Sequence, residues 1–228
     1  MSAWAVIVAG GCGKRMGSEI PKQLLKIGGI TIIERTLKPF GKCLDIEGIV
    51  IVASESCIEY IKTVCNVPKI IYLVSGGAQR QDSVWNGLCA VPEKAEIVVI
   101  HDAVRPFINS ELISTCVRSA MEHGAVSVMR PLKETVKAVE NDIVVHTPDR
   151  SSLWITLTPQ SFKRELILKA HKHAQEDCFA GTDDSMLVER IGYPVHIIEG
   201  DDMNIKITTP VDLEIARTLV KLYEKKGG

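Results

Sequence analysis

Two basic side chains, Arg15 and Lys22, stand beside a glycine-rich segment, and this combination suits the binding of a polyphosphate. The segment reads A-G-G-C-G-K-R-M-G from Ala9, and P-K-Q follows shortly after it. Glycines let a backbone approach a ligand closely and expose its N–H groups. Exposed amides beside cations bind phosphate oxygens. We therefore expect phosphate chemistry here, with Arg15 and Lys22 as the working cations and Lys14 as a solvated charge.

This loop differs from two familiar nucleotide-binding loops. The P-loop pattern G-x-x-x-x-G-K-[ST] is absent, and the dinucleotide pattern G-x-G-x-x-G fails because Met16 stands where the third glycine is needed. What remains, G-G-x-G-[KR]-R-M followed by P-K-Q, resembles the signature of sugar-phosphate cytidylyl- and uridylyltransferases. The combined pattern is far more specific than either half.

The elements that must position this loop follow an alternating pattern. Short apolar, β-branched runs predict buried strands of a mostly parallel sheet, at residues 4–9, 48–53, 69–74, 97–100, 125–129 and 195–198. Helical periodicity predicts helices between them, at residues 31–40, 54–64, 81–90 and 110–123, the last ended by Gly124. This alternation predicts an α/β, doubly wound fold, and the resemblance of the loop implies that it is a Rossmann-like nucleotidyltransferase fold. We expect one cytidylyltransferase domain over residues 1–228.

One stretch breaks this pattern. Residues 133–147 alternate with a period of two on both sides of E-N-D at 140–142, which predicts a β-hairpin too polar for the main sheet. An isolated two-stranded arm is marginally stable and should pack on something. We expect a protruding dimerisation arm at about residues 133–153 and a homodimer formed through it. A hairpin lying on its own domain is the alternative.

Composition narrows the class of protein. The chain has 228 residues, 46% hydrophobic and 24% charged, with a formal net charge of −1. No global basic field exists to attract a nucleic acid, and no apolar stretch predicts a membrane span or a leader. Seven cysteines occur singly, without C-x-x-C, which argues against a disulfide framework or a zinc site and favours a reducing compartment. We expect a cytoplasmic enzyme.

Ligands of open α/β sheets bind beyond the carboxyl ends of the strands, and polar motifs gather after the predicted strands. In order they are G-G-x-x-R-x-x-S, H-D-A-x-R-P, D-R-x-x-L-W, L-T-P-Q, T-D-D and N-I-K-x-T. This ordered set covers essentially the whole chain and resembles the 2-C-methyl-D-erythritol 4-phosphate cytidylyltransferase (IspD) family. The related ribitol-5-phosphate cytidylyltransferases share several of these motifs, and ribitol phosphate stays open as the alternative acceptor.

The resemblance assigns roles residue by residue. It implies phosphate-binding, catalytic roles for Arg15, Lys22 and Lys206, and a nucleotide pocket formed by Ala9, Gly10, Gly11, Gly13, Gly77, Ser83 and Asp102. It implies that the acceptor is bound by Arg105, Thr135, Arg150, Thr158, Thr182 and Thr208, with Arg150 reaching in from a partner's arm. Asp102 is the candidate metal ligand. The chain departs from some relatives at Ala78, where an acidic residue is frequent.

The implied reaction transfers CMP from CTP to 2-C-methyl-D-erythritol 4-phosphate and releases pyrophosphate, in non-mevalonate isoprenoid precursor biosynthesis. A phosphate monoester is already mostly dianionic at neutral pH, so no general base is needed. The barrier is the repulsion between anions, which cations and Mg²⁺ must offset. Mg²⁺ is the expected cofactor.

Other polar residues are weaker candidates for a catalytic or binding role. We expect His101 to have a packing role, His171 and His173 to be solvated on a helix, and one of Asp183 and Asp184 to lie at a helix N-terminus. Two other function classes stay open. The missing third glycine argues against a nicotinamide-dependent oxidoreductase, and the joint presence of Arg15, Lys22 and Lys206 argues against a non-catalytic nucleotide-binding regulator.

Overall fold

A seven-stranded sheet forms the centre of the molecule in a computed structural model that describes residues 2–11, 20–65 and 67–226. The strand order is β11-β7-β10-β6-β1-β4-β5, and all neighbours are parallel except those of β10. The strands are β1 (Ala3–Ala9), β4 (Ile46–Ala53), β5 (Ile70–Ser75), β6 (Ile97–Asp102), β7 (Ala125–Pro131), β10 (Trp154–Lys163) and β11 (His196–Glu199). The predicted α/β, mostly parallel sheet is confirmed, and each predicted strand matches one of these within a few residues.

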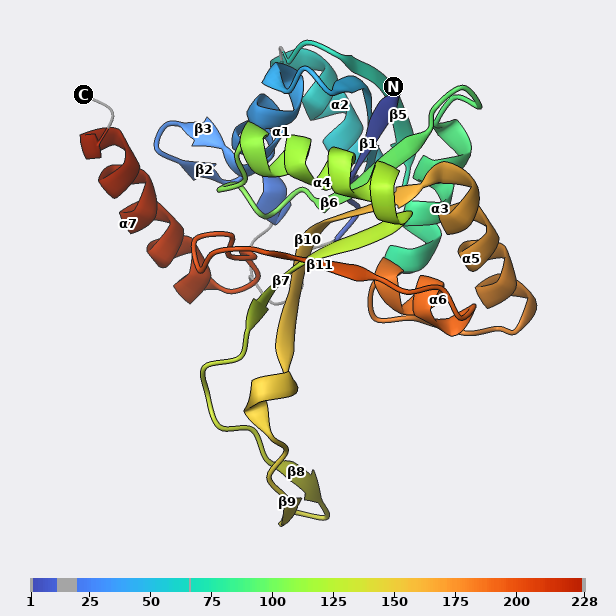
Figure 1. Cartoon of the computed structure of the whole chain (residues 1–228). Helices are drawn as coiled ribbons and strands as arrows, with labels where there is room; N and C mark the ends of the chain where they lie inside the picture. Colours follow the sequence, from blue (N-terminus) through green and yellow to red (C-terminus); the bar gives the residue numbers. More distant parts are fainter. Residues whose placement is uncertain (1, 12–19, 66, 227–228) are drawn as a thin grey trace.

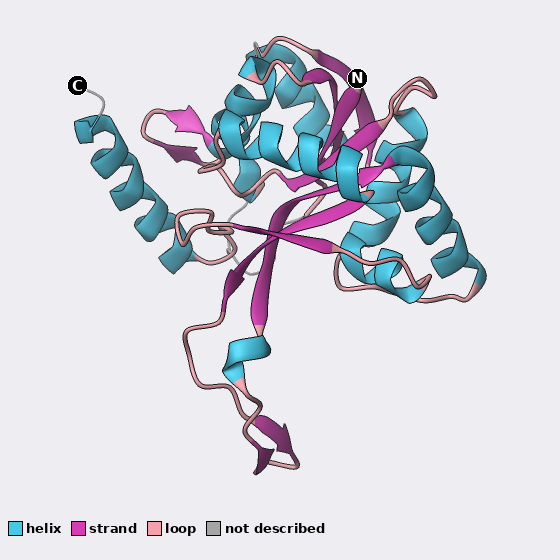
Figure 2. Cartoon of the chain, in the orientation of Figure 1, coloured by secondary structure: helices cyan, strands magenta, loops and turns pink. Residues whose placement is uncertain are grey.

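Helices cover both faces of this sheet, as Figure 2 shows. One face packs α1 (Ile32–Lys42), α2 (Glu55–Val64) and α4 (Ser110–His123) against alternate strand residues. The other face packs α3 (Arg80–Ala90), α5 (Arg164–Glu176) and α6 (Asp184–Arg190). Strands buried on both sides read as continuous apolar runs, which is why β1, β4 and β6 could be located from the sequence.

Local signals set the helix boundaries. Thr31 accepts a hydrogen bond from the backbone N–H of Glu34, whose side chain accepts one from the N–H of Thr31, forming a capping box at the start of α1. Asn109 caps α4 in the same way through the N–H of Leu112. Gly124 ends α4 with a φ of 84°, a conformation that favours glycine. The four predicted helices are confirmed to within two residues at each end.

A smaller apolar cluster lies beside the main sheet. It joins α7 (Pro210–Lys226) to the two-stranded β2 (Lys26–Ile27) and β3 (Ile30–Thr31), and its buried members include Phe107, Ile207 and Leu213. In Figure 1, α7 lies at one side of the molecule next to these strands. No helix in the described part of the chain is long and apolar enough to cross a membrane.

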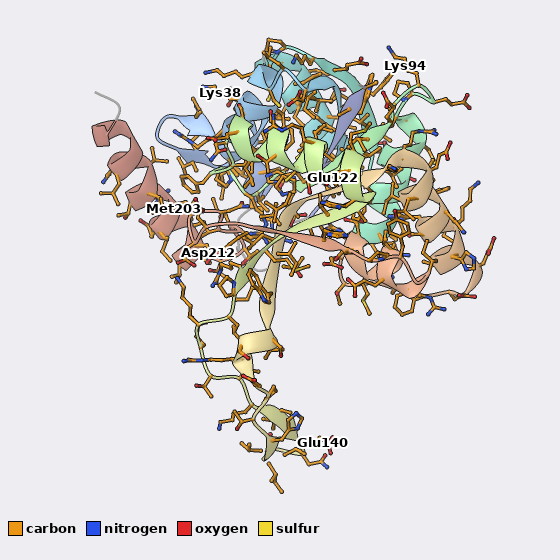
Figure 3. The ribbon with its side chains drawn as sticks, viewed as in Figure 1. Lys38, Lys94, Glu122, Glu140, Met203 and Asp212 are labelled. Atoms are coloured by element: carbon orange, nitrogen blue, oxygen red, sulfur yellow. The ribbon has the colours of Figure 1, made fainter. Side chains whose placement is uncertain are left out.

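The predicted arm is a projecting hairpin. Strands β8 (Ala138–Glu140) and β9 (Ile143–His146) pair antiparallel, and Asn141 and Asp142 turn the chain with positive φ angles of 48° and 63°. Figure 1 shows the arm extending away from the sheet, and Figure 3 places Glu140 at its far end. Its apolar side chains face solvent, with Ile143 69% exposed and Val144 55% exposed.

The sequence did not reveal β10 as a strand. Residues 157–160 form the L-T-P-Q motif, which lies in none of the predicted strands, but they lie inside β10, which runs antiparallel between β6 and β7. Pro159 and the polar residues around it hide the strand pattern. The pairing with β7 also shifts register between Thr156 and Gln160, so the strand bends where the motif stands.

Candidate active site

A cavity of about 380 Å³ opens at the carboxyl ends of β1 and β6. It lies where the sheet order reverses, because β1 has β4 and β5 on one side and β6 on the other. Such reversal points are the usual ligand sites of open α/β sheets. Its lining combines glycine-rich backbone with charged side chains: Val8, Ala9, Gly10, Gly11, Lys22, Gln23, Gly77, Ala78, Gln79, Arg80, Ser83, Asp102, Val104 and Lys206.

Glycines allow two loops to approach each other on one side of the cavity. A Cβ on Gly10 or on Gly76 would lie 3.2 Å from Ser83 Oγ, and one on Gly77 would lie 2.3 Å from Asp82 Cβ. Ser83 Oγ accepts a hydrogen bond from the N–H of Gly77 and donates one to the carbonyl of Gln79. The loop after β5 is therefore fixed against the first turn of α3, and only glycine fits at residue 77.

Lys22 reaches the cavity from η2 (Lys22–Leu24), a short 3-10 helix after the loop. The neighbouring Gln23 is buried and donates from Nε2 to the carbonyl of Ala9 over 2.7 Å. Gln23 Nε2 also lies 2.9 Å from Cys57 Sγ. This contact ties η2 to the end of β1, so the P-K-Q segment holds its lysine at the cavity.

Asp102, at the end of β6, is the centre of the charged side of the cavity. Its Oδ1 accepts from Arg80 Nε over 3.2 Å, and its Oδ2 lies 2.8 Å from Lys206 Nζ and 3.7 Å from Arg105 Nε. Burial alone would raise the pKa of Asp102, but Arg80, Lys206 and Arg105 together hold it well below its ordinary value. Asp102 is therefore a carboxylate at neutral pH, surrounded by three cations.

His101 and Thr158 support Asp102 from inside the sheet. Thr158 Oγ1 accepts from the backbone N–H of Asp102 over 3.2 Å and lies 2.9 Å from His101 Nδ1. His101 Nε2 lies 3.2 Å from the carbonyl of Arg105, which fits a neutral ring protonated at Nε2. Burial lowers the pKa of His101 to about 4. His101 thus packs and orients, as expected, and carries no charge near neutral pH.

Lys206 is held in place through the backbone of its segment. The carbonyl of Asn204 accepts from Arg105 Nη1 over 2.6 Å, and Asn204 Nδ2 donates to the carbonyl of Thr158 over 2.7 Å. The N–H of Ile207 donates to the carbonyl of Val104. Residues 204–207 therefore attach both to the loop after β6 and to β10, which fixes where the ammonium of Lys206 can reach.

A second buried carboxylate lies behind Arg80. Asp184 Oδ2 accepts from Arg80 Nη1 over 2.8 Å, and His171 Nε2 lies 3.4 Å from Asp184 Oδ1. The expectation that His171 is solvated is wrong, because its side chain is fully buried beside Asp184 and stacks on Trp85. His173, two residues further on α5, is exposed as expected. Asp183 is the predicted helix-terminal residue, since its side chain accepts from the N–H of Met186 at the start of α6.

The cavity unites eight of the residues singled out from the sequence. These are Ala9, Gly10, Gly11, Lys22, Gly77, Ser83, Asp102 and Lys206. Arg105 and Thr158 are buried beneath Asp102 and do not line the cavity. Gly13 and Arg15 lie outside the described residues, and so does Cys12.

The four other predicted acceptor residues lie elsewhere in this chain. Thr208 Oγ1 donates to Asp212 at the start of α7, and Thr182 is exposed with its hydroxyl 3.6 Å from Met186 Sδ. Thr135 and Arg150 are exposed on the arm, and Arg150 Nη1 donates to the carbonyl of Lys133. None of these four lines the cavity of the chain that carries them.

Six cavity residues have no role assigned from the sequence: Val8, Val104, Arg80, Gln23, Gln79 and Ala78. Arg80 is the arginine of G-G-x-x-R-x-x-S and Gln23 is the last residue of P-K-Q, but the resemblance implies no role for either. Gln79 and Ala78 belong to the same turn as Gly77. The signal for Arg80 was its presence in a motif after a strand, but its partner Asp184 lies 104 residues away.

Comparison with known proteins shows which family this chain is similar to. The family model for 2-C-methyl-D-erythritol 4-phosphate cytidylyltransferase (IspD) matches residues 3–222. A protein of that name from Geobacter metallireducens is 42% identical and covers 97% of this chain and 98% of its own length. Another, from Desulforamulus reducens, is 44% identical, with 95% of each chain covered.

Solved structures with similar folds cover nearly the whole chain. The 4-diphosphocytidyl-2C-methyl-D-erythritol synthase of Anaerococcus prevotii superposes with a TM-score of 0.86 at 31% identity, covering 96% of each chain. The 2-C-methyl-D-erythritol 4-phosphate cytidylyltransferase of Thermus thermophilus superposes with a TM-score of 0.76 at 30% identity, covering 95% of this chain and 98% of the other.

Proposed function

This chain belongs to the 2-C-methyl-D-erythritol 4-phosphate cytidylyltransferase family, and we propose that the cavity beside Asp102 is its active site. It transfers CMP from CTP to 2-C-methyl-D-erythritol 4-phosphate, giving 4-diphosphocytidyl-2-C-methyl-D-erythritol and pyrophosphate in non-mevalonate isoprenoid precursor synthesis. The observation that supports this most directly is the meeting of glycine-rich backbone with Lys22, Arg80 and Lys206 in one cavity.

The nucleotide fits the glycine-lined side of the cavity. We propose that Gly10, Gly11 and Gly77 admit the base and ribose by close backbone approach, with Ser83 at the base. Ser83 Oγ donates its proton to the carbonyl of Gln79, so toward the base it can only accept a hydrogen bond. An acceptor suits the exocyclic amine of cytosine, which uracil lacks.

The chemical step needs charge compensation. A phosphate oxygen of the acceptor attacks the α-phosphorus of CTP in line, the bond to the bridging oxygen breaks, and pyrophosphate leaves with the electron pair. The dianionic acceptor needs no base. We propose that Lys22 and Arg15 stabilise the charge that develops at the α-phosphate and that Lys206 stabilises the neighbouring phosphates.

Mg²⁺ is part of this proposal. Asp102 is the one carboxylate among the cavity-lining residues, and no group of three side chains suited to a metal exists in the described part of the chain. Mg²⁺ commonly binds through one or two carboxylates together with substrate phosphates and water, so the residues present fit that mode, with Asp102 as the protein ligand. Bound there, the ion would neutralise phosphate charge. Lys206 occupies Asp102 Oδ2 in this structure.

We also propose a cytoplasmic homodimer. The apolar, solvent-facing arm supports the dimer, because Val139, Ile143, Val144 and Val145 would be covered by a second copy. In that dimer Thr135 and Arg150 of one chain would bind the acceptor phosphate at the other chain's cavity. Six described cysteines are free thiols, which supports a reducing compartment.

Pyrophosphate release tests the proposed function. The enzyme is supplied with CTP, Mg²⁺ and either 2-C-methyl-D-erythritol 4-phosphate or ribitol 5-phosphate. Turnover with the first alone is expected. Turnover with ribitol 5-phosphate alone would contradict the assigned acceptor while keeping the cytidylyl transfer, and the absence of pyrophosphate with both would contradict the function.

A further inference from the structure

Arg80 joins two buried carboxylates that come from different elements, Asp102 at the end of β6 and Asp184 at the start of α6. Its Nε donates to Asp102 Oδ1 over 3.2 Å and its Nη1 donates to Asp184 Oδ2 over 2.8 Å. The side chain of Asp184 is 1% exposed and does not line the cavity, whereas Arg80 does. A planar guanidinium with two occupied donors has little freedom to turn, so Asp184 acts on the cavity only through Arg80.

Hydrogen bonds and packed neighbours hold Asp184 in a fixed position. Its backbone N–H donates to Gln160 Oε1 over 3.0 Å, and its other carboxylate oxygen faces His171 Nε2 at 3.4 Å. The ring of His171 is fully buried and stacks on Trp85 with centroids 6.1 Å apart. Every neighbour that fixes Asp184 is thus part of the packed layer of α3, α5, α6 and β10.

Burying a carboxylate is costly unless it is paired. Burial would raise the pKa of Asp184, but Arg80 holds it below its ordinary value, so the charge is retained. An apolar residue in the same place would avoid this cost. A carboxylate that stays charged despite the free-energy cost of its burial is consistent with a role in orienting Arg80.

We propose that Asp184 is a positioning residue for nucleotide binding, and this inference rests on the proposed function. It anchors one end of the Arg80 guanidinium so that the other end holds Asp102 Oδ1 and leaves Asp102 Oδ2 to Lys206. Without Asp184, Arg80 turns both donors to Asp102 and competes with Lys206. Asp102 and Lys206 then lose the arrangement that receives the ribose and phosphates of CTP.

Charge alone predicts the opposite result, which makes the inference testable. The cluster of three cations (Arg80, Arg105 and Lys206) and two carboxylates (Asp102 and Asp184) has a net charge of plus one. The variant Asp184→Asn raises this to plus two. A purely electrostatic effect would tighten the binding of a triphosphate, whereas lost positioning weakens it.

The test compares three proteins in two measurements. Calorimetry with Mg²⁺ and without acceptor gives the affinity for CTP, and pyrophosphate release gives KM for CTP and kcat. The proteins are wild type, Asp184→Asn, and Asp177→Asn, which removes an equivalent charge from an exposed pair with Arg190 on the same side of the molecule. We expect Asp184→Asn to weaken CTP binding about tenfold and raise KM by a similar factor, with a smaller change in kcat. Asp177→Asn should match wild type. Unchanged or tighter CTP binding by Asp184→Asn would overturn the inference.

Two further variants keep the test decisive if Asp184→Asn folds poorly. Arg80→Lys keeps the cluster's charge on a side chain that is 28% exposed, but a single ammonium cannot reproduce the fork across both carboxylates. We expect it also to weaken CTP binding. Asp184→Glu keeps the carboxylate and should bind CTP more tightly than Asp184→Asn; equal affinities in these two would count against positioning.

A wild type that binds CTP without releasing pyrophosphate would overturn the proposed function, while the affinity comparison would still decide the role of Asp184.

Discussion

Lys206 Nζ lies 2.8 Å from Asp102 Oδ2, so the expected phosphate-binding cation is paired with the candidate metal ligand before any nucleotide binds. Arg80 holds the other oxygen of the same carboxylate. Asp102 therefore neutralises part of a cationic cluster that would otherwise repel itself. Its removal affects both the cluster and the proposed metal ligand.

The variant Asp102→Asn tests both effects. Arg105, which is 7% exposed, loses its carboxylate partner, and an uncompensated buried charge costs about 3–5 kcal/mol. We expect a lower Tm and a loss of turnover on the order of 10²–10³, with a higher Mg²⁺ concentration needed for half-maximal rate. Asp202→Asn, at an exposed carboxylate paired with Arg130, is the matched control. Unchanged Mg²⁺ dependence in Asp102→Asn would contradict its role as metal ligand.

The variant Lys22→Ala tests the cation contributed by the P-K-Q segment. The fold should survive because Gln23 still ties η2 to the carbonyl of Ala9. Turnover should fall by about 10²–10³, as it does when a comparable charge stabiliser is removed from a transition state. The measurement is kcat by pyrophosphate release together with Tm. Lys26→Ala, at an exposed lysine nearby, should leave both unchanged, and a normal kcat in Lys22→Ala would exclude the catalytic role.

The sequence predicted the parts of the fold whose signals are local. Strand β1 is a continuous apolar run that ends in glycines, and α4 is bounded by Asn109 and Gly124, so both could be located within two residues. Strand β10 was missed because Pro159 and polar neighbours interrupt it, and because an antiparallel strand inserted between β6 and β7 leaves no sign in its own residues.

The residues of the site could likewise be predicted only where the signal is local in the sequence. Lys22, Asp102 and Lys206 stand in motifs that follow strands, and the structure brings all three to one cavity. The Arg80 to Asp184 pair could not be found, because its members are 104 residues apart and nothing near Asp184 in sequence indicates burial. His171 was misjudged for a related reason. Charged neighbours on α5 suggested a solvated face, although His171 lies on the side of the helix that contacts α3 and α6.

His101 predicts a loss of stability in mild acid. Burial lowers the pKa of His101 from its ordinary 6.5 to about 4, so between these values the unfolded chain binds a proton that the folded chain does not. Stability from this group is complete above pH 6.5 and decreases as the pH falls toward 4. At pH 5 the loss relative to pH 7.5 is on the order of 2 kcal/mol. Urea unfolding at the two pH values measures it.

The variant His101→Gln isolates that contribution from other titrating groups. It should be less stable than wild type at pH 7.5, because Thr158 Oγ1 loses its partner, but the difference between the two pH values should shrink. His173→Gln, at an exposed histidine on α5, should retain the full difference. An identical pH dependence in His101→Gln and wild type would show that this ring titrates normally.

Among the described glycines of the nucleotide pocket, Gly77 tolerates a side chain least. The added Cβ of Gly77→Ala would lie 2.3 Å from Asp82 Cβ and 3.2 Å from the backbone nitrogen of Ser83, so the loop must move away from α3. We expect a cost of about 1–3 kcal/mol in unfolding free energy and a raised KM for CTP. Gly11→Ala, whose Cβ would have only Lys22 Cε within 4 Å among the described residues, at 3.8 Å, should lose much less stability. Equal Tm values for the two variants would contradict this account.

The arm predicts an oligomer whose sites are shared. Deleting residues 134–145 removes β8, all of β9 except His146, and most of the exposed apolar residues of the arm. Because those residues need a partner to cover them, the deletion should give monomers in light scattering. If Thr135 and Arg150 serve the partner's cavity, the monomers should also release no pyrophosphate. A fully active monomer would refute the shared site.

Mixing two inactive variants separates a shared site from a merely structural arm. Lys22→Ala disables the cavity of its own chain, whereas Arg150→Ala, on the exposed arm, should disable the cavity of the partner. Each homodimer is then inactive, but a mixed dimer holds one intact site. After unfolding and refolding together, equal amounts should recover about a quarter of wild-type turnover, since half of the dimers are mixed and each has one working site of two. If Arg150 served the cavity of its own chain instead, one site of the mixed dimer would lack Lys22 and the other would lack Arg150, so no activity would return.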